Sequence, residues 1–172
     1  METLYAHTYA TSVGPVCITA NEEGVSSLAF LRDVQTKRVF NAAAGPAANI
    51  VEKPSAFTNQ CANELMEYLA GKRRYFDVPL SLAGSEFEVL VWQSLRNIPF
   101  ASTATCTDIA AQLGNAQSFR AVSRAIGKNA LPLLIPDHRV VSSSGAPLGT
   151  GETARRRKAI LDFELMQAGL AR

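Results

Sequence analysis

The sequence predicts an α+β protein in which a small sheet domain precedes a mostly helical domain. The first third of the chain alternates apolar and polar residues in short runs, which is typical of strands, whereas apolar residues in the second half recur at helical spacing. A capping-box pattern at Ser85 opens the helical part, so we expect domains over residues 1–83 and 84–172. With 172 residues, 47% of them hydrophobic, the chain can form one compact unit or two small ones and is not disordered.

The first domain is expected to contain an antiparallel meander and one helix. The strand-like runs are residues 4–10, 16–20 and 25–30. Residues 41–56 are small and interrupted by Pro and Gly, which predicts a loop. From Ser55 onward apolar residues recur every four positions, which predicts a helix whose buried face includes Cys61. Residues 75–80 are expected to add an edge strand, because only an edge position tolerates the proline there.

Helical signals continue through the second domain. We expect helices from Ser85 to near Pro99, from Thr107 to Leu113, over residues 117–126 and over residues 155–167. The two short central helices have the spacing of a helix-turn-helix, although many unrelated helical hairpins share that spacing. The second of them places Arg120, Arg124 and Lys128 at intervals of four, so one stripe is cationic and favours contact with DNA.

Charge and composition exclude several classes of protein. The net charge of +2 is unevenly distributed: residues 1–83 carry seven basic against eight acidic residues, and residues 84–172 carry ten against seven. This excess fits a solvated face as well as a nucleic-acid surface. No apolar run approaches the roughly 18–20 residues of a membrane span, and the first residues lack the features of a signal peptide. We therefore expect a soluble, cytoplasmic protein, associated with the nucleoid in a bacterium or nuclear in a eukaryote.

Cysteine and histidine usage gives no sign of a metal or disulfide site. Cys17, Cys61 and Cys106 form no Cys-x-x-Cys pair, and the only histidines are His7 and His138. These spacings match no zinc pattern, so we expect neither a metal nor another cofactor.

Residues 135–141, Ile-Pro-Asp-His-Arg-Val-Val, resemble the Ile-Pro-Cys-His-Arg-Val active-site motif of the O-6-alkylguanine-DNA alkyltransferases, the suicidal methylated-DNA repair proteins. Further matches in the family's order are Ser12 to Val16, residues 67–71, Phe87, Val91-Trp92, Leu95, Ile98-Pro99, Ile109-Ala110, Gly114, Arg120 to Val122, Asn129 and residues 158–164. The resemblance implies a ribonuclease-H-like α/β domain followed by a helical domain whose helix-turn-helix enters the minor groove. It also implies that a monomer binds double-stranded DNA carrying alkylated or otherwise altered bases.

Family roles can be carried over residue by residue. Arg120 holds the position of the arginine that replaces the extruded nucleotide, and Asn129 that of the asparagine that steadies the pocket. Glu164 matches the carboxylate that orients the catalytic histidine, here His138, although such a buried pair can also be purely structural. The candidate sets are Asp137, His138, Glu164 and Asn129 for catalysis; Arg120, Ala121, Phe119, Ser123, Arg124, Lys128, Arg139 and Cys106 for DNA contact; and Thr150, Gly151, Glu152, Val140 and Ser144 for the pocket.

The chain departs from the family at the reacting atom. In the family a cysteine thiolate, released by a histidine–water–glutamate relay, accepts the alkyl carbon, and Asp137 occupies that cysteine's position. A carboxylate is a much poorer nucleophile toward an alkyl ether than a thiolate is. Nearby positions differ as well: Cys106 replaces a tyrosine, residues 150–153 replace a tyrosine and paired glycines, and Phe119 and Ser123 replace small residues.

Three functional hypotheses follow. The first is a DNA-binding member of the family that flags altered bases for other repair proteins, its expected partners besides DNA, without transferring the alkyl group, by analogy with alkyltransferase-like proteins. The second is a dealkylase in which Asp137 accepts the alkyl group as an ester that water hydrolyses, with His138 and Glu164 as base and orienting group. The third is a scaffold that has lost its DNA function.

Overall fold

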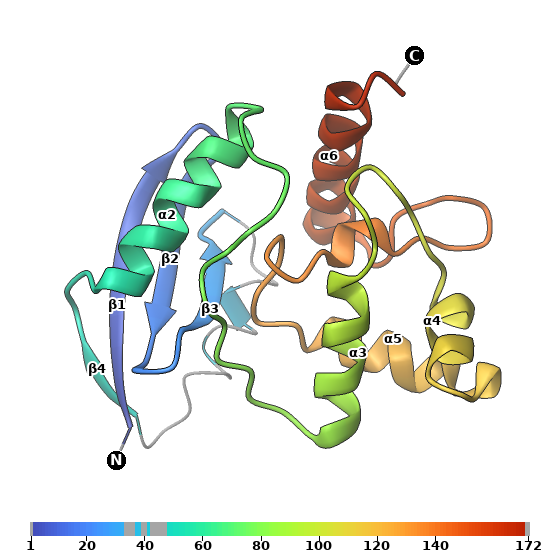
Figure 1. Ribbon diagram of the computed structural model, residues 1–172, viewed down its shortest axis with the longest axis horizontal. Coiled ribbons are helices and arrows are strands. Elements are labelled where there is room, and N and C mark those ends of the chain that lie inside the picture. Colours follow the sequence, from blue (N-terminus) through green and yellow to red (C-terminus); the bar gives the residue numbers. More distant parts are fainter. Residues whose placement is uncertain (1, 33–36, 39–40, 42–47, 171–172) are drawn as a thin grey trace. The chain divides into compact units, whose positions relative to one another are not determined.

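The computed structural model describes residues 2–32, 37–38, 41 and 48–170. Its chain divides into two compact units, Met1–Ala83 and Gly84–Arg172. A sheet with a helix forms the first unit and helices form the second, which confirms the predicted α+β class (Figure 1). None of the helices in the described ranges is long and apolar enough to cross a membrane.

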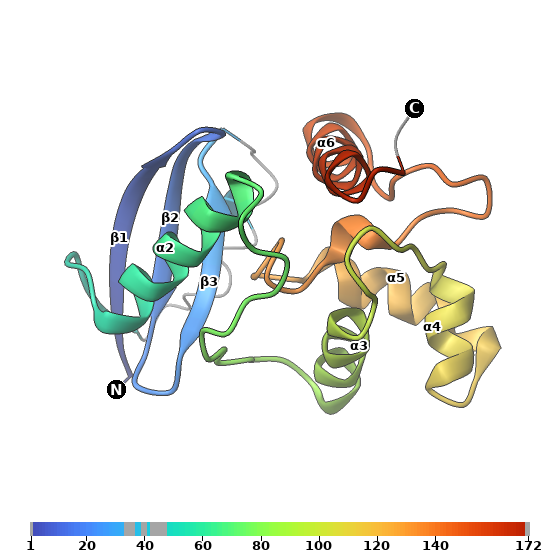
Figure 2. The same cartoon turned by 45° about the horizontal axis from the view of Figure 1, so that its top comes forward.

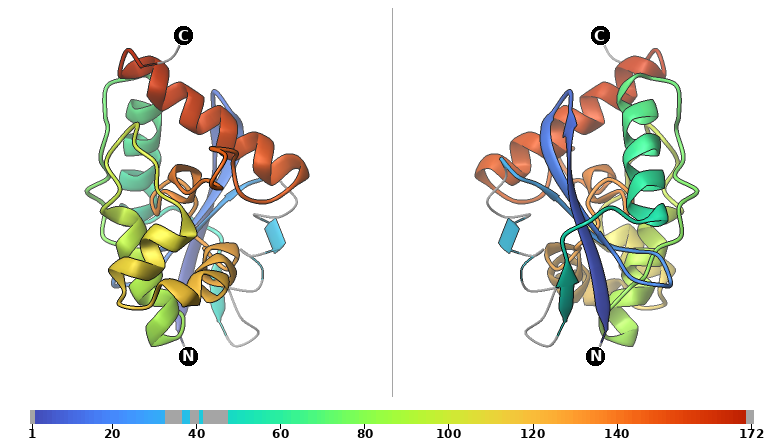
Figure 3. Two further views of the ribbon diagram at one scale, coloured as in Figure 1. Left: turned by 90° about the vertical axis from the view of Figure 1, so that its right-hand side faces the viewer. Right: turned by 90° about the vertical axis from the view of Figure 1, so that its left-hand side faces the viewer.

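The sheet of the first unit has the strand order β3-β2-β1-β4. Its strands are β1 (Thr3–Thr11), β2 (Gly14–Ala20), β3 (Val25–Phe30) and β4 (Asn49–Val51). The first three are antiparallel, so the predicted meander is confirmed. β4 pairs in parallel with β1 and lies beside its N-terminal end (Figure 3). That short strand lies in the segment predicted as a loop, of which residues 42–47 are outside the described residues.

Helix α2 (Ala56–Leu69) packs on the sheet and begins where the sequence predicts. The Ser55 side chain accepts a hydrogen bond from the Thr58 backbone N–H, and Thr58 reciprocates, which satisfies two otherwise unpaired donors at the helix start. Cys61 is fully buried, as expected for the inner face.

The predicted strand over residues 75–80 is wrong. Only Leu80 pairs with the sheet, through an isolated bridge to Val25. The Glu64 carboxylate from α2 accepts the backbone N–H groups of Asp77 and Val78, at 2.8 and 3.1 Å. Those donors are therefore used by a buried side chain and not by a neighbouring strand, a competition that the local sequence does not reveal.

The second unit consists of helices joined by turns and longer loops (Figure 2). They are α3 (Glu86–Arg96), α4 (Cys106–Gln112), η1 (Ala116–Ser118), α5 (Phe119–Gly127), η2 (Asp137–Arg139) and α6 (Gly151–Gln167), where η denotes a 3₁₀ turn. Helices α4 and α5, linked through Gly114 in a left-handed conformation (φ +94°), form the expected helix-turn-helix.

Two helix starts differ from their predictions. α4 is capped by Thr105, whose side chain accepts from the Asp108 N–H while the Asp108 carboxylate accepts from the Thr105 N–H. The predicted start at Thr107 is thus two residues late. At α3, Ser85 caps as expected, but the Glu88 carboxylate pairs with Lys128 and does not complete the capping box.

Packing between helices fixes the segment that carries Asp137. The Trp92 indole N–H of α3 donates to the Ala125 carbonyl of α5 at 2.8 Å, which ties the two helices together. Residues 131–141 follow and are buried throughout. Within them the chain turns at Leu133, a non-glycine residue with φ +77°. The Asn129 side chain closes this turn by accepting from the Leu131 N–H and donating to the Ile135 carbonyl.

Helix α6 buries a polar stripe. Its buried residues are Thr153, Arg157, Leu161 and Glu164. We predicted an apolar face of Ile160, Leu161, Phe163 and Leu165, but only Leu161 among these is fully buried. Charged groups occupy the stripe because η2, against which α6 packs, supplies partners of opposite charge.

Candidate functional site

The predicted histidine–carboxylate pair is present at full burial. His138 in η2 and Glu164 in α6 both have 0% of their surface exposed, and Nε2 of His138 lies 2.9 Å from Oε2 of Glu164. His138 and Glu164 are 26 positions apart in the sequence, so their contact joins η2 to α6. The geometry is that of a histidine held in one orientation by a carboxylate.

Arg139 belongs to the same buried cluster and not to the surface. Its Nε and Nη2 donate to the two oxygens of Glu164 at 2.9 and 2.7 Å, and its Nη1 donates to the Ile98 carbonyl at 2.8 Å. We grouped Arg139 with the DNA-contacting residues, but its side chain is only 7% exposed and its guanidinium is used inside the protein. A bidentate arginine of this kind is the usual partner of a buried carboxylate.

The cluster is charge-balanced with a neutral histidine. Burial lowers the pKa of His138 below its ordinary value, although Glu164 opposes that shift. Burial by itself would raise the pKa of Glu164, but the hydrogen bonds from His138 and Arg139 outweigh it and hold the pKa well below its ordinary value. Glu164 is therefore ionised, and in neutral His138 the N–H at Nε2 faces that anion.

Asp137 is held by a second set of partners. Its side chain is 2% exposed, and Oδ2 accepts hydrogen bonds from Arg157 Nη2 at 3.1 Å and from Asn129 Nδ2 at 3.4 Å. Arg156 Nη1 lies 3.9 Å from the other oxygen, Oδ1. Arg157 also donates to the Leu148 carbonyl at 3.0 Å, so it joins α6 to the preceding loop as well as to η2.

Two acceptor atoms beside each other in sequence lack donors. Oδ1 of Asp137 and Nδ1 of His138 are buried and accept no hydrogen bond from any residue that the structure describes. The Nε–H donor of Arg157 is likewise buried without an acceptor in the described ranges. Unsatisfied buried polar atoms are uncommon, and each calls for an explanation.

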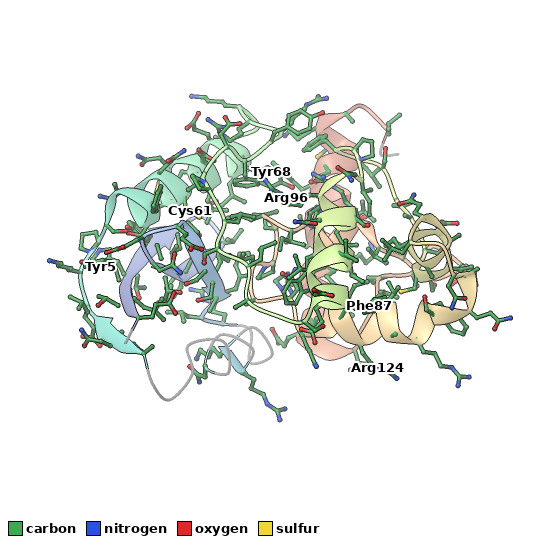
Figure 4. The ribbon with its side chains drawn as sticks, turned by 60° about the horizontal axis from the view of Figure 1, so that its bottom comes forward. Tyr5, Cys61, Tyr68, Phe87, Arg96 and Arg124 are labelled. Carbon is green, nitrogen blue, oxygen red and sulfur yellow. The ribbon has the colours of Figure 1, made fainter. Side chains whose placement is uncertain are left out.

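The outer face of α5 presents the predicted cations. Arg120 and Arg124 are exposed, and Figure 4 shows Arg124 extending away from the helix. Phe119 is 42% exposed, and the Arg120 guanidinium lies 5.7 Å from its ring centroid. Ser123 is exposed and Ala121 half-buried on the same helix. Lys128 is exposed too, but its Nζ is 3.1 Å from Oε1 of Glu88, so part of its charge is already paired.

The predicted pocket residues are placed in different environments. Val140 is buried and forms a bridge to Ala104, whereas Ser144 lies in the exposed loop before α6, and Thr150, Gly151 and Glu152 form the exposed start of that helix. Cys106, the first residue of α4, is half-buried. Burial raises the pKa of its thiol, and the nearby Arg157 charge opposes that rise. The structure thus brings Cys106 and Arg157 into electrostatic range of one another. In the described ranges no three His, Cys, Asp or Glu residues cluster in a way that could hold a metal ion.

Comparison with known protein families covers both units. The model of the 6-O-methylguanine DNA methyltransferase ribonuclease-like domain matches residues 4–82, and that of the DNA binding domain of the same protein matches residues 86–166. The chain belongs to the 6-O-methylguanine DNA methyltransferase family. The first match also confirms the ribonuclease-like character expected for the sheet unit.

Relatives of this methyltransferase family are similar over most of the chain. The methylated-DNA–protein-cysteine methyltransferase of Methanosarcina mazei is 30% identical over 161 residues, which cover 94% of this chain and 97% of the relative. The Mycobacterium tuberculosis protein of the same name is 37% identical over 115 residues, or 67% and 69% of the two chains. Crystal structures of the M. tuberculosis O6-methylguanine methyltransferase and of its complex with DNA each match with a TM-score of 0.79 at 29% identity, covering 95% of this chain and 94% of the other.

Arg156 and Arg157 are the site residues that sequence reasoning missed. Arg157 Nη2 lies 3.1 Å from Oδ2 of Asp137, and Arg156 Nη1 lies 3.9 Å from Oδ1. The sequence does hold a signal for this pairing. A buried carboxylate needs a cation, and residues 155–158, in the final predicted helix, form a run of four basic residues. The run lies at the start of the helix predicted over residues 155–167, and its pairing with Asp137 was not predicted.

Proposed function

We propose that this protein binds duplex DNA carrying alkylated or otherwise altered bases and does not accept the alkyl group. The observation that carries the proposal is the ion pair between Asp137 and Arg157, with 3.1 Å between Oδ2 and Nη2, at the position where the family resemblance expects the acceptor cysteine. Family membership and the DNA complex of the M. tuberculosis relative support DNA as the partner.

Asp137 is poorly suited to accept an alkyl group. An attacking carboxylate must direct a lone pair at the alkyl carbon. Oδ2 already uses its lone pairs on Arg157 and Asn129, which leaves only Oδ1 for such an attack. Attraction to a guanidinium lowers the free energy of the anion before the reaction and so raises the barrier to attack. The same ion pair argues against the turnover hypothesis, because an ester at Asp137 would leave Arg157 buried without its counter-charge.

Cys61 and Cys106 are poorly suited to take over the cysteine's role. Cys61 is buried in the first unit, and burial raises the pKa of its thiol to about 12. Cys106 lies in the same unit as the candidate site, but the pKa of its thiol is also raised, so little thiolate forms at neutral pH. Both cysteines therefore favour a protein that recognises DNA without alkyl transfer.

DNA contact is assigned to the exposed face of α5. Arg120 and Arg124 lie there without a partner carboxylate among the ion pairs of the described residues, so both charges are available to phosphates or to the groove. Arg120 is the residue proposed to fill the stack after a nucleotide is extruded, with the Phe119 ring beside it. A scaffold that had lost DNA function would not need to keep this cationic face.

Fluorescence anisotropy with labelled duplexes tests the proposal. The duplexes are identical except for a central guanine or O6-methylguanine, and each is titrated at two salt concentrations. We expect binding that weakens as salt rises and that is tighter for the altered duplex. Arg124→Ala, on the same helix, should weaken both duplexes alike and reduce the salt slope by about one, whereas Arg120→Ala should mainly reduce the preference. Absence of salt-dependent binding by the wild-type protein would contradict the proposal.

A further inference from the structure

The unpaired acceptors at the site indicate what kind of group it can receive. An ionised carboxylate only accepts hydrogen bonds, and neutral His138, with its proton at Nε2 facing Glu164, can only accept at Nδ1. Oδ1 of Asp137 and Nδ1 of His138 are therefore two buried acceptors without a hydrogen bond from any described residue, although Arg156 Nη1 lies within ion-pair distance of Oδ1, at 3.9 Å. Each loses its hydrogen bond to water on burial, so a ligand that brings a donor is favoured over one that brings another acceptor.

Arg157 adds a donor to the same site. Its Nη2 is hydrogen-bonded to Asp137 and its Nη1 to Leu148, while its Nε–H has no acceptor within the described part of the chain. The Asp137–Arg157 pair thus offers one free acceptor and one free donor, both buried. A base edge that carries a donor next to an acceptor is the complement of that pair.

DNA bases differ in this respect at the exocyclic atom that the family's acceptor residue faces. Adenine has an N6 amino donor beside ring-nitrogen acceptors, and cytosine has an N4 amino donor. Guanine and thymine carry an oxygen there, and after O-alkylation the atom is an ether oxygen that only accepts. An ether oxygen beside the Asp137 carboxylate would bring two acceptors together without a proton between them.

We propose that the site around Asp137 receives an extruded base that carries an amino nitrogen where guanine has O6 and thymine has O4, namely adenine (N6) or cytosine (N4) and their N-alkylated forms, in preference to an O-alkylated guanine or thymine. This inference rests on the proposed function, because it requires that the protein extrude a base from DNA. It changes the ligand class from the O-alkylated guanine that the family names indicate to bases whose altered atom is nitrogen. N-alkylation of an amino group leaves one N–H, which is enough for the hydrogen bond to Oδ1.

A pair of duplexes that differ by one atom tests the preference. One carries 6-methylaminopurine and the other 6-methoxypurine, each opposite an abasic-site analogue so that no base pair is lost on extrusion. Because a hydrogen bond to a charged acceptor is gained with the amine only, we expect the wild-type protein to bind the methylaminopurine duplex about tenfold more tightly. In Asp137→Asn an amide of the same shape supplies a donor in place of one carboxylate oxygen. This variant should bind the two duplexes about equally, or bind the methoxypurine duplex more tightly.

The outcomes separate this inference from the proposed function. Equal affinity of the wild-type protein for the two duplexes, or tighter binding of the methoxypurine duplex, overturns the proposed preference. If both duplexes still bind in a salt-dependent way, the proposed function stands. Failure to bind either duplex at low salt refutes the proposed function itself. Circular dichroism and thermal unfolding show whether the Asp137→Asn variant folds. If it does not fold, the comparison of the two duplexes with the wild-type protein decides the question alone.

Discussion

Two buried charge clusters meet at η2, and they are satisfied to different degrees. Glu164 receives hydrogen bonds on both oxygens, from Ala101, Arg139 and His138, so its charge is fully compensated inside the protein. Asp137 receives hydrogen bonds from Arg157 and Asn129 on one oxygen only.

The difference separates a structural role from a ligand-binding role. A saturated carboxylate such as Glu164 holds η2 against α6 and has nothing left to offer a ligand. A half-satisfied carboxylate such as Asp137 costs stability unless something else supplies a donor. We infer that the His138–Glu164 pair mainly positions the η2 turn, and that Oδ1 of Asp137 is the atom of the two carboxylates that can accept a hydrogen bond from a ligand.

Glu164→Gln should produce the largest loss of stability. The change leaves the Arg139 guanidinium buried without a counter-charge, for which we expect a decrease of about 3–5 kcal/mol in the free energy of unfolding. Urea unfolding followed by circular dichroism measures it. Glu67→Gln is the matched control, since the Glu67 side chain is 47% exposed and pairs with Arg73 at 3.7 Å; we expect a change below about 0.5 kcal/mol. Equal effects of the two changes would mean that the Glu164 cluster is not structural.

Removal of Arg157 should cost less. Arg157→Met strands the Asp137 carboxylate, but Arg156 remains 3.9 Å from its other oxygen, so we expect a loss of about 2–3 kcal/mol. Asp137→Leu combined with Arg157→Met removes both charges and should recover most of that loss, as replacement of buried ion pairs by apolar residues often does. A double variant no more stable than Arg157→Met would show that the two residues are not energetically coupled.

Acid should destabilise the protein through His138 first. Its pKa is lowered by burial, so as pH falls below the ordinary value of 6.5 the unfolded chain binds a proton that the folded chain does not. Glu164 adds to the loss at lower pH, because its lowered pKa stabilises the fold above the ordinary value of 4.5 and ceases to do so as pH falls through the folded value. Denaturant unfolding between pH 7.5 and 5 should show a decline that His138→Gln flattens; a wild-type profile without slope in that range would contradict a buried neutral histidine.

Sequence patterns predicted the regular parts of the fold and one of the two charge clusters. Alternation and helical spacing located β1 to β3, α2, α3 and the helix-turn-helix, and the family motif placed His138 with Glu164. The buried position of Arg139 and the pairing of Arg157 with Asp137 were not predicted. Both depend on which charges a packed helix brings together, and local spacing carries no information about that.

The smallest expected effect concerns Arg124 and Lys128, the two cations near the C-terminal end of α5. Arg124 has an exposed charge, whereas Lys128 shares its charge with Glu88. We therefore expect Lys128→Ala to reduce DNA affinity and its salt slope less than Arg124→Ala does, by a factor of about two or more in affinity. Lys128→Ala combined with Glu88→Gln removes one positive and one negative charge. The net charge of this double variant therefore equals that of the wild-type protein. Indistinguishable salt slopes for Arg124→Ala and Lys128→Ala would show that the ion pair opens on DNA.

Intact-mass spectrometry after incubation with duplex DNA containing O6-methylguanine tests most directly whether Asp137 is a held anion or an acceptor. The measurement follows the protein mass and, by nucleoside analysis of the same sample, the methylated base. We expect no protein adduct and no loss of O6-methylguanine, because the Asp137 carboxylate is paired with Arg157 and burial raises the pKa of the Cys61 and Cys106 thiols. A stoichiometric gain of one methyl group at Asp137, or removal of the methyl group from DNA without an adduct, would contradict the account.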